Sequence, residues 1–224
     1  MSMSVEQFLS LSDAEQLQTI KDLNDIGQEE IIIDVLTGVG IDNLSVPLLG
    51  ELGRAYNNND KPEEAIKVFK TIDTEHRDAV WHYRCAYSHG SIASTNHEAY
   101  KSENMQQMLA LVDNGVRLAT KEGRNDIKEY CFEVMDMCRL QMDFEKCEVD
   151  YPDLCLNYSK YIAEKKKKRE GVPRQRTITV EEILATDDMW TINEPAYWTI
   201  NIYGSYDNYL ESEKGFTVEQ RYLN

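Results

Sequence analysis

The sequence predicts an all-α fold built from antiparallel pairs of helices. Apolar residues recur three and four positions apart along most of residues 1–169, which is the spacing of one buried helix face. Serine or proline begins several of these segments, and glycine or asparagine follows them. The connecting turns are short, so successive helices should lie side by side. We expect seven to nine helices up to residue 169.

The first predicted helix runs from Ser12 to Ile26. Ser12 and Glu15 form a capping box, in which each residue's side chain can bind the other's backbone N–H. Gly27 follows as the stop signal. The apolar residues that define its buried face are Leu17, Ile20, Leu23 and Ile26.

Three further segments carry weaker signals. Glu29 to Thr37 contains three consecutive isoleucines that suit a strand, but its acidic first turn and the following Gly38 favour a helix. A helix is expected from Leu44 to Asn57. The next one begins at Pro62, which suits a first helical turn, and continues to Ile72.

These last two helices carry a pattern of small and large residues. Gly53 and Ala65 are small where two antiparallel helices would approach closely, and larger residues fill the space beside them. The pattern consists of Leu49, Leu52, Gly53, Tyr56, Ala65, Phe69 and Ile72. In type and spacing it resembles a tetratricopeptide repeat, although Arg77 stands where that motif usually has proline.

The segment from Ala79 to Gly90 resembles the first helix of a second repeat. This repeat is degenerate, because Cys85 and Ala86 stand where Leu and Gly are common. Its partner helix lies within residues 96–121 and has an apolar side formed by Met105, Met108, Leu109, Val112, Val116 and Ala119. A single repeat cannot bury its apolar face alone. The resemblance, over about residues 44–121, therefore implies a short tetratricopeptide-like α-solenoid.

Two more helices complete the predicted helical domain, residues 1–169. One spans Asn125 to Met142, and a shorter one begins at Pro152 and ends in a basic run. The apolar residues of the first are Ile127, Tyr130, Cys131, Val134, Met135, Cys138 and Leu140. Residues 170–189 are predicted to be a linker with a short helix at 181–184, and residues 190–224 an irregular, aromatic-rich segment that starts a second domain.

The last residues carry a separate signal. Thr217 and Gln220 form a second capping box, which predicts a helix, but the sequence ends within two turns. We expect either a docked end or, preferably, a longer protein. Residues 198–224 resemble the start of a bacterial domain of unknown function, family 4375, whose following Asn-Gly-Gly segment is missing. Members of that family include an acidic DNA mimic, so the resemblance implies a bacterial immunity or regulatory protein.

The net charge and the cysteines indicate which class of partner and which cellular compartment we expect. The chain has 40 acidic and 24 basic side chains, for a net charge of −16. This field repels nucleic acid and favours a basic protein partner, although acidity could serve solubility alone. No apolar stretch has the length of a membrane span, and the five cysteines lack a CxxC spacing. We expect a cytoplasmic protein with reduced thiols.

One segment of this acidic chain is basic. Residues 164–176 hold seven Lys or Arg and two Glu. The run could contact phosphate or an anionic membrane, but it lacks interleaved aromatic residues and a large apolar face. A solvated helix end and linker is the preferred interpretation, without direct nucleic-acid or membrane contact.

Nothing in the sequence indicates catalysis, so we expect no enzyme activity and no cofactor. The common nucleophile, zinc-protease and phosphate-loop motifs are missing. His82, Cys85 and His89 would share a helix face, but a structural zinc site needs a fourth ligand, so a packed helix is preferred over a metal site. Cys131 and Cys138 likewise suit core packing.

Surface recognition remains as the expected function. By resemblance, the first helix of each repeat lines a concave groove, which makes Arg54, Asn57, Tyr83 and Tyr87 the candidate partner-binding residues. Either tyrosine could instead belong to the core. The leading hypothesis is a module that binds a basic protein, such as a toxin or a nucleic-acid-binding protein. The alternatives are an accessory repeat domain of an enzyme whose catalytic domain lies beyond residue 224, and a passive scaffold.

Overall fold

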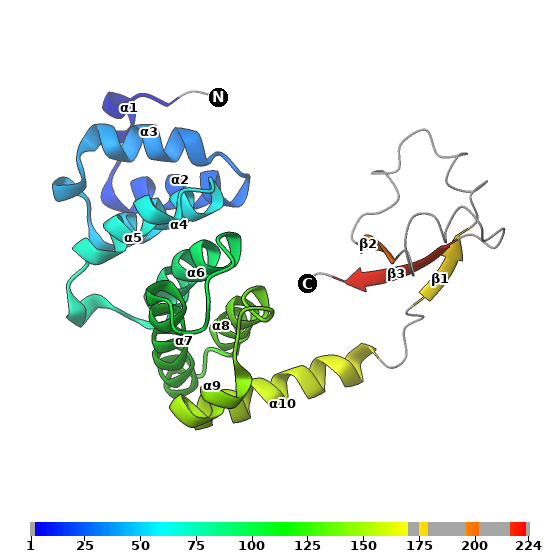
Figure 1. The fold of residues 1–224 in the computed structure, drawn as a ribbon. Helices are drawn as coiled ribbons and strands as arrows, with labels where there is room; N and C mark the ends of the chain where they lie inside the picture. Colours follow the sequence, from blue (N-terminus) through cyan, green and yellow to red (C-terminus); the bar gives the residue numbers. More distant parts are fainter. Residues whose placement is uncertain (1–2, 170–174, 179–195, 202–215, 223–224) are drawn as a thin grey trace. The chain divides into compact units, whose positions relative to one another are not determined.

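The computed structural model describes residues 3–169, 175–178, 196–201 and 216–222 (Figure 1). The chain divides into two compact units, Met1–Tyr161 and Ile162–Asn224. The first unit consists of helices, and the division falls within the last of them, α10 (Pro152–Arg169).

The predicted all-α fold of packed helices is confirmed up to residue 169, where the structure has ten α-helices. Each of the longer helices from α2 to α8 packs against the next one along the chain. Several also contact the helix after that, as α2 does with α4 and α4 with α6, which gives a solenoid-like stack. The helices are α1 (Val5–Leu9), α2 (Asp13–Asp25), α3 (Glu29–Val39), α4 (Val46–Asn58), α5 (Pro62–Thr71), α6 (Ala79–Thr95), α7 (Glu103–Glu122), α8 (Asn125–Met137), α9 (Phe144–Asp150) and α10. Two 3₁₀ turns, η1 (Ile41–Asn43) and η2 (Thr74–His76), connect helices.

The capping box predicted for α2 is confirmed. The backbone N–H of Ser12 donates to a carboxylate oxygen of Glu15 at 2.9 Å. Ile20 is fully buried at the centre of the predicted face. Ile26 was wrongly assigned to that face: it is exposed, because it lies at the cap position after the helix has ended. The ambiguous isoleucine segment is a helix, α3, as predicted, and Ile32 supplies its buried centre.

The close approach predicted between α4 and α5 is present. A Cβ atom placed on Gly53 would lie only 2.3 Å from a ring carbon of Phe69. Phe69, Leu52 and Ala65 are fully buried around this contact. The pair therefore packs at a separation that only a residue without a side chain allows.

The helices that follow are partly as predicted. Every apolar residue assigned to the buried side of α7 is buried. However, α8 ends at Met137 instead of Met142, because Asp143 caps a separate helix, α9, by accepting a hydrogen bond from the backbone N–H of Lys146. Leu140, predicted to belong to this helix, lies instead in the intervening turn and is 96% exposed. The short helices α1 and α9 take the count above the predicted seven to nine.

The second unit contains a small antiparallel sheet. Its strands are β1 (Gln175–Ile178), β2 (Ala196–Asn201) and β3 (Phe216–Tyr222), in the order β1-β3-β2. Thr217 pairs with Thr177 on one side and Asn201 on the other. The helix predicted from Thr217 was therefore wrong, and the aromatic-rich segment is regular where it is described. A helix this short is marginal in isolation, whereas pairing on both edges satisfies the backbone of β3.

Two further findings concern residues 181–184 and membrane crossing. The short helix predicted at 181–184 lies outside the described residues. In the described part of the chain, no helix combines the length and the apolar character that crossing a bilayer requires.

Candidate functional site

The helical unit has a groove of about 880 Å³, hereafter the α4–α6–α8 groove. It is lined chiefly by α4, α6 and the beginning of α8, with Lys21 of α2 at its edge. The structure brings all four sequence-predicted residues to this one surface: Arg54, Asn57, Tyr83 and Tyr87. Arg54 and Asn57 are three residues apart on α4, and Tyr83 and Tyr87 are four apart on α6, so each pair shares a helix face.

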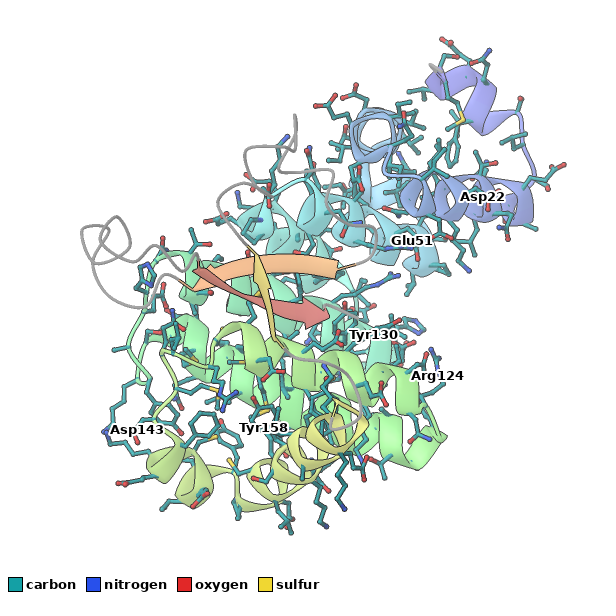
Figure 2. All side chains as sticks on the ribbon, turned by 90° about the vertical axis from the view of Figure 1, so that its right-hand side faces the viewer. Asp22, Glu51, Arg124, Tyr130, Asp143 and Tyr158 are labelled. Carbon is teal, nitrogen blue, oxygen red and sulfur yellow. The ribbon has the colours of Figure 1, made fainter. Side chains whose placement is uncertain are left out.

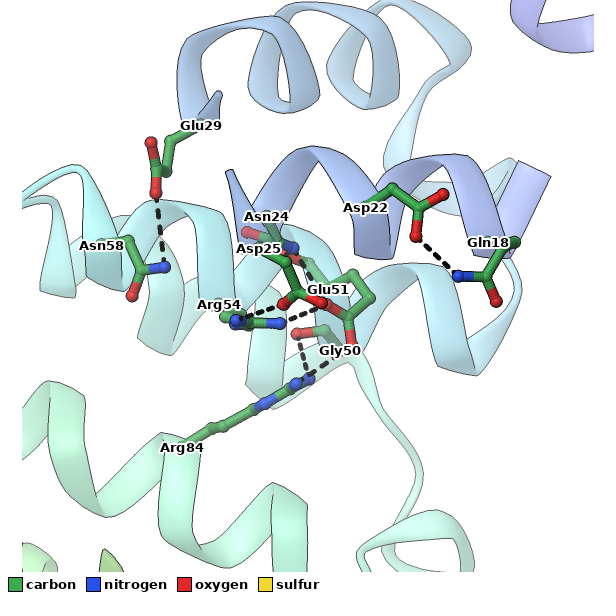
Figure 3. A network of polar contacts seen from close by, with 10 residues as sticks. All are labelled: Gln18, Asp22, Asn24, Asp25, Glu29, Gly50, Glu51, Arg54, Asn58 and Arg84. Atoms are coloured by element: carbon green, nitrogen blue, oxygen red, sulfur yellow. Dashed lines mark hydrogen bonds and ion pairs between the residues drawn. The ribbon is translucent and has the colours of Figure 1, made fainter. Parts of the chain in front are cut away.

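A buried carboxylate forms one wall of the groove (Figure 3). Glu51 is 5% exposed, and its side chain accepts hydrogen bonds from Asn24 Nδ2 at 2.9 Å and from Arg84 Nη2 at 3.0 Å. Arg54 Nη1 lies 3.6 Å away. Buried charges are tolerated when they are paired and hydrogen-bonded. Glu51 thus joins α2, α4 and α6 at a single point.

The two arginines of this cluster differ in how firmly they are held. Arg84 also donates from Nη1 to the carbonyl oxygen of Gly50 at 3.0 Å, and its side chain is 17% exposed. Arg54 is 31% exposed and pairs at 2.9 Å with Asp25, which is itself 64% exposed. Exposed ion pairs contribute little to stability. Of these two arginines, Arg54 is therefore the one that another molecule can engage more easily.

Asn57 lines the groove but its amide is used inside the protein. Its Nδ2 donates to the carbonyl oxygen of Arg84 at 3.0 Å, and its Oδ1 accepts from Ser88 Oγ at 2.7 Å. The residue is buried. Asn57 fixes α4 against α6, so its part in the groove is to hold the two walls together.

Aromatic side chains of α6 and α8 also line the groove. Tyr83 stacks on Tyr130, with ring centroids 5.3 Å apart and an angle of 30° between the rings. Burial raises the pKa of Tyr83 to about 12, so its hydroxyl stays protonated at neutral pH. Tyr83 and Tyr87 are half-buried, which leaves each with both packed and accessible surface. Tyr130, one of the apolar residues of the helix predicted from Asn125, is 44% exposed and is labelled in Figure 2.

The charge of the groove differs from that of the whole chain. An ion pair between Arg124 and Asp126, with N–O distances of 2.9 and 2.7 Å, lies at the α8 end and holds the pKa of Asp126 at about 2. Asp78 is occupied as the cap of α6, where it accepts from the backbone N–H of Trp81. The charged residues of the lining are Lys21, Arg54, Arg84 and Arg124 against Glu51, Asp78 and Asp126. A protein of net charge −16 therefore has a groove without acidic excess.

The possible metal ligands of α6 serve other purposes. Cys85 is buried, and His89 binds Asn104 Oδ1 through Nδ1 at 2.9 Å. His82 Nδ1 lies 2.9 Å from the carbonyl oxygen of Asp78. Burial lowers the pKa of both histidines. Within the described ranges, no group of three or more His, Cys, Asp or Glu side chains is arranged to hold a metal ion.

Comparison with known proteins adds no relative. No family model, curated protein or solved structure matches the chain.

Proposed function

We propose that this chain is a protein–protein interaction module of a bacterial immunity or regulatory protein, and that the α4–α6–α8 groove receives a segment of its partner. The observation that carries the proposal is the meeting of partly accessible aromatic and arginine side chains on one concave surface: Arg54, Tyr83, Tyr87 and Tyr130. Tyrosine and arginine are the residue types that most often anchor protein interfaces.

The chemistry of the lining favours a polypeptide over a small apolar ligand. Pockets for small molecules are mainly hydrophobic with a few polar groups. In the α4–α6–α8 groove, charged and amide side chains such as Arg54, Asn58 and Asp126 alternate with apolar ones such as Ile72 and Ile127. A peptide backbone with mixed side chains can satisfy both kinds of surface.

The net charge of the chain and the charged residues of the groove favour different features in that partner. The net charge of −16 would speed the approach of a basic protein, such as a toxin or a nucleic-acid-binding protein, and slow that of an acidic one. The segment that enters the groove meets Arg54 and Lys21, so an acidic or carbonyl-bearing group suits that end. We therefore propose a basic partner that inserts a neutral or locally acidic segment.

The test compares two surface variants of the whole chain. The immobilised protein captures partners from a bacterial lysate, bound proteins are released with increasing salt and identified by mass spectrometry, and the affinity of the main partner is then measured. Tyr130→Ala removes an exposed aromatic from the groove and should weaken binding at least about tenfold. Leu140→Ala, which removes an exposed apolar side chain outside the groove lining, should not.

A partner that binds wild type, Tyr130→Ala and Arg54→Ala equally well would contradict the groove as the binding surface. Capture that is insensitive to salt would contradict the role given to the acidic field. Tyr130→Ala and Leu140→Ala should both retain the wild-type unfolding midpoint, since Tyr130 and Leu140 are both exposed.

A further inference from the structure

Two of the five cysteines are in direct contact. Cys147 lies in α9 and Cys155 in α10, and their Sγ atoms are 3.1 Å apart, joined by a hydrogen bond. Both residues are buried. Only Tyr151 separates the two helices, so the contact closes a tight helical corner. Elsewhere in the described part of the chain no cysteine sulfur contacts another; Cys138, for example, donates to the carbonyl oxygen of Gly90.

We propose that Cys147 and Cys155 are a site of reversible oxidation, forming an intramolecular disulfide by exchange with a low-molecular-weight disulfide such as oxidised glutathione. A disulfide bond is about 2.05 Å long, so the sulfurs need to approach by only about 1 Å. The fold already holds the second thiol beside the first, which makes the ring-closing step intramolecular.

The reaction has two balanced exchange steps. The Cys155 thiolate attacks a sulfur of oxidised glutathione, forms a mixed disulfide and releases one glutathione thiolate. The Cys147 thiolate then attacks the Cys155 sulfur, forms the intramolecular disulfide and expels the second glutathione. In total, the protein loses two electrons and two protons, and one glutathione disulfide becomes two thiols.

The surroundings indicate which sulfur reacts first. Burial raises the pKa of both thiols, but for Cys155 the hydrogen bond to Cys147 works in the opposite direction by stabilising the thiolate. For Cys147 the contact with Cys155 adds to the effect of burial and raises the pKa further, the Asp150 carboxylate raises it too, and only a hydrogen bond with Tyr100 lowers it. Cys155 is therefore the attacking thiol, and Cys147 resolves the mixed disulfide.

Access to the buried pair requires a local opening, and α9 is suited to it. The helix has seven residues, and Val149 on its outer side is 80% exposed. Short helices with little buried surface open more readily than the body of a domain. Oxidation would fasten α9 to the first turn of α10, and a thiol reductant would release it.

The test uses the full chain in its reduced form, exposed to oxidised glutathione for different times. Remaining thiols are alkylated and the protein is digested with trypsin. Cleavage after Lys146 and Lys160 leaves both cysteines in one peptide. That peptide should lose both alkylation sites and two hydrogen atoms. Cys85, Cys131 and Cys138 should react at least about tenfold more slowly, since none has a resolving thiol in contact.

Single variants separate the two roles. Cys147→Ser should leave Cys155 with one bound glutathione, because the resolving thiol is missing. Cys155→Ser should leave Cys147 as slow to react as Cys131. A peptide that stays reduced while the other cysteines react, or equal rates at all five, would overturn the proposal. So would the same preference for this pair in concentrated urea, because the contact would then not depend on the fold.

Discussion

Gly53 offers the sharpest test of how the groove-forming helices pack. Changing Gly53 to Ala adds one methyl group on the side of α4 that faces α5. Its Cβ would lie 2.3, 2.4 and 3.0 Å from Cε1, Cζ and Cδ1 of Phe69. Carbon atoms in favourable contact are roughly 3.5–4.0 Å apart, so the overlap exceeds about 1 Å. Phe69 is fully buried, so a shift of its ring would disturb the packing around it.

The expected magnitude is a balance of two terms. Replacing glycine by alanine inside a helix stabilises it by about 1 kcal/mol. Inserting a methyl group into a packed core costs about 1–3 kcal/mol, and the degree of overlap places this site at the upper end. We therefore expect Gly53→Ala to lower the free energy of unfolding by about 2 kcal/mol.

A matched control is available on the same helix. At Gly50 an added Cβ would meet only the flexible end of Arg84, with Nη1 at 3.4 Å. Gly50→Ala should therefore be neutral or stabilising by up to about 1 kcal/mol. Urea unfolding followed by helical circular dichroism measures both variants, with an unchanged slope showing that only stability has changed.

The double variant Gly53→Ala/Phe69→Leu completes the test. Leucine is smaller than the ring and relieves the overlap, so the double variant should be more stable than the sum of the single changes predicts by about 1–2 kcal/mol. If Gly53→Ala is as stable as Gly50→Ala, or if the double variant shows no coupling, the close approach of α4 and α5 is not what selects glycine here.

Three further predictions concern charged and titrating groups. Glu51→Gln removes the charge that Arg84 faces, and should lower the free energy of unfolding by about 2–3 kcal/mol, whereas Asp25→Asn at an exposed pair should change it by less than about 0.5 kcal/mol in urea titrations. Burial holds the pKa of His89 below its ordinary value of 6.5, so its contribution to stability is present above pH 6.5 and is lost as the pH falls through the lower folded-state value. NMR titration of the imidazole should show this, and His89→Gln should flatten the same part of the pH–stability curve. Burial raises the pKa of Tyr83 to about 12 from 10.0, so the folded state favours the neutral phenol, and the stability it contributes is complete below pH 10.0 and is lost between there and about pH 12. Tyr83→Phe should lack this loss in alkaline unfolding; an unchanged curve would contradict the assigned burial.

Helices with both an apolar period and a cap signal were predictable from the sequence. In α2 and α5, Ser12 and Pro62 set the start, and local preference agrees with tertiary packing. The boundary between α8 and α9 could not be predicted from the sequence. The residues between the two helices are compatible with a continuous helix, so the cap at Asp143 could not be recognised. For Thr217, pairing with strands distant in sequence overrides a local capping pattern.

The candidate site was predictable in outline but not in its chemistry. Arg54, Tyr83 and Tyr87 were predicted from the resemblance to tetratricopeptide repeats, and all three line the α4–α6–α8 groove. Glu51 could not be recognised, since a glutamate within a helix is ordinarily solvated and its partners come from α2 and α6. Tyr130 has the spacing of a core residue, and only the edge position of α8 beside the groove leaves it exposed.

The two arginines at Glu51 differ in what happens to their acidic partners when another molecule binds them. A partner carboxylate that takes Arg54 displaces Asp25, which is already 64% exposed and simply returns to water. A carboxylate that takes Arg84 would leave Glu51, 5% exposed, without its nearest counter-charge. Of these two arginines, Arg54 can therefore change partner while Arg84 stays bound to Glu51, so an acidic group that binds at this cluster is directed to the α2 side and the spacing of α2, α4 and α6 is preserved.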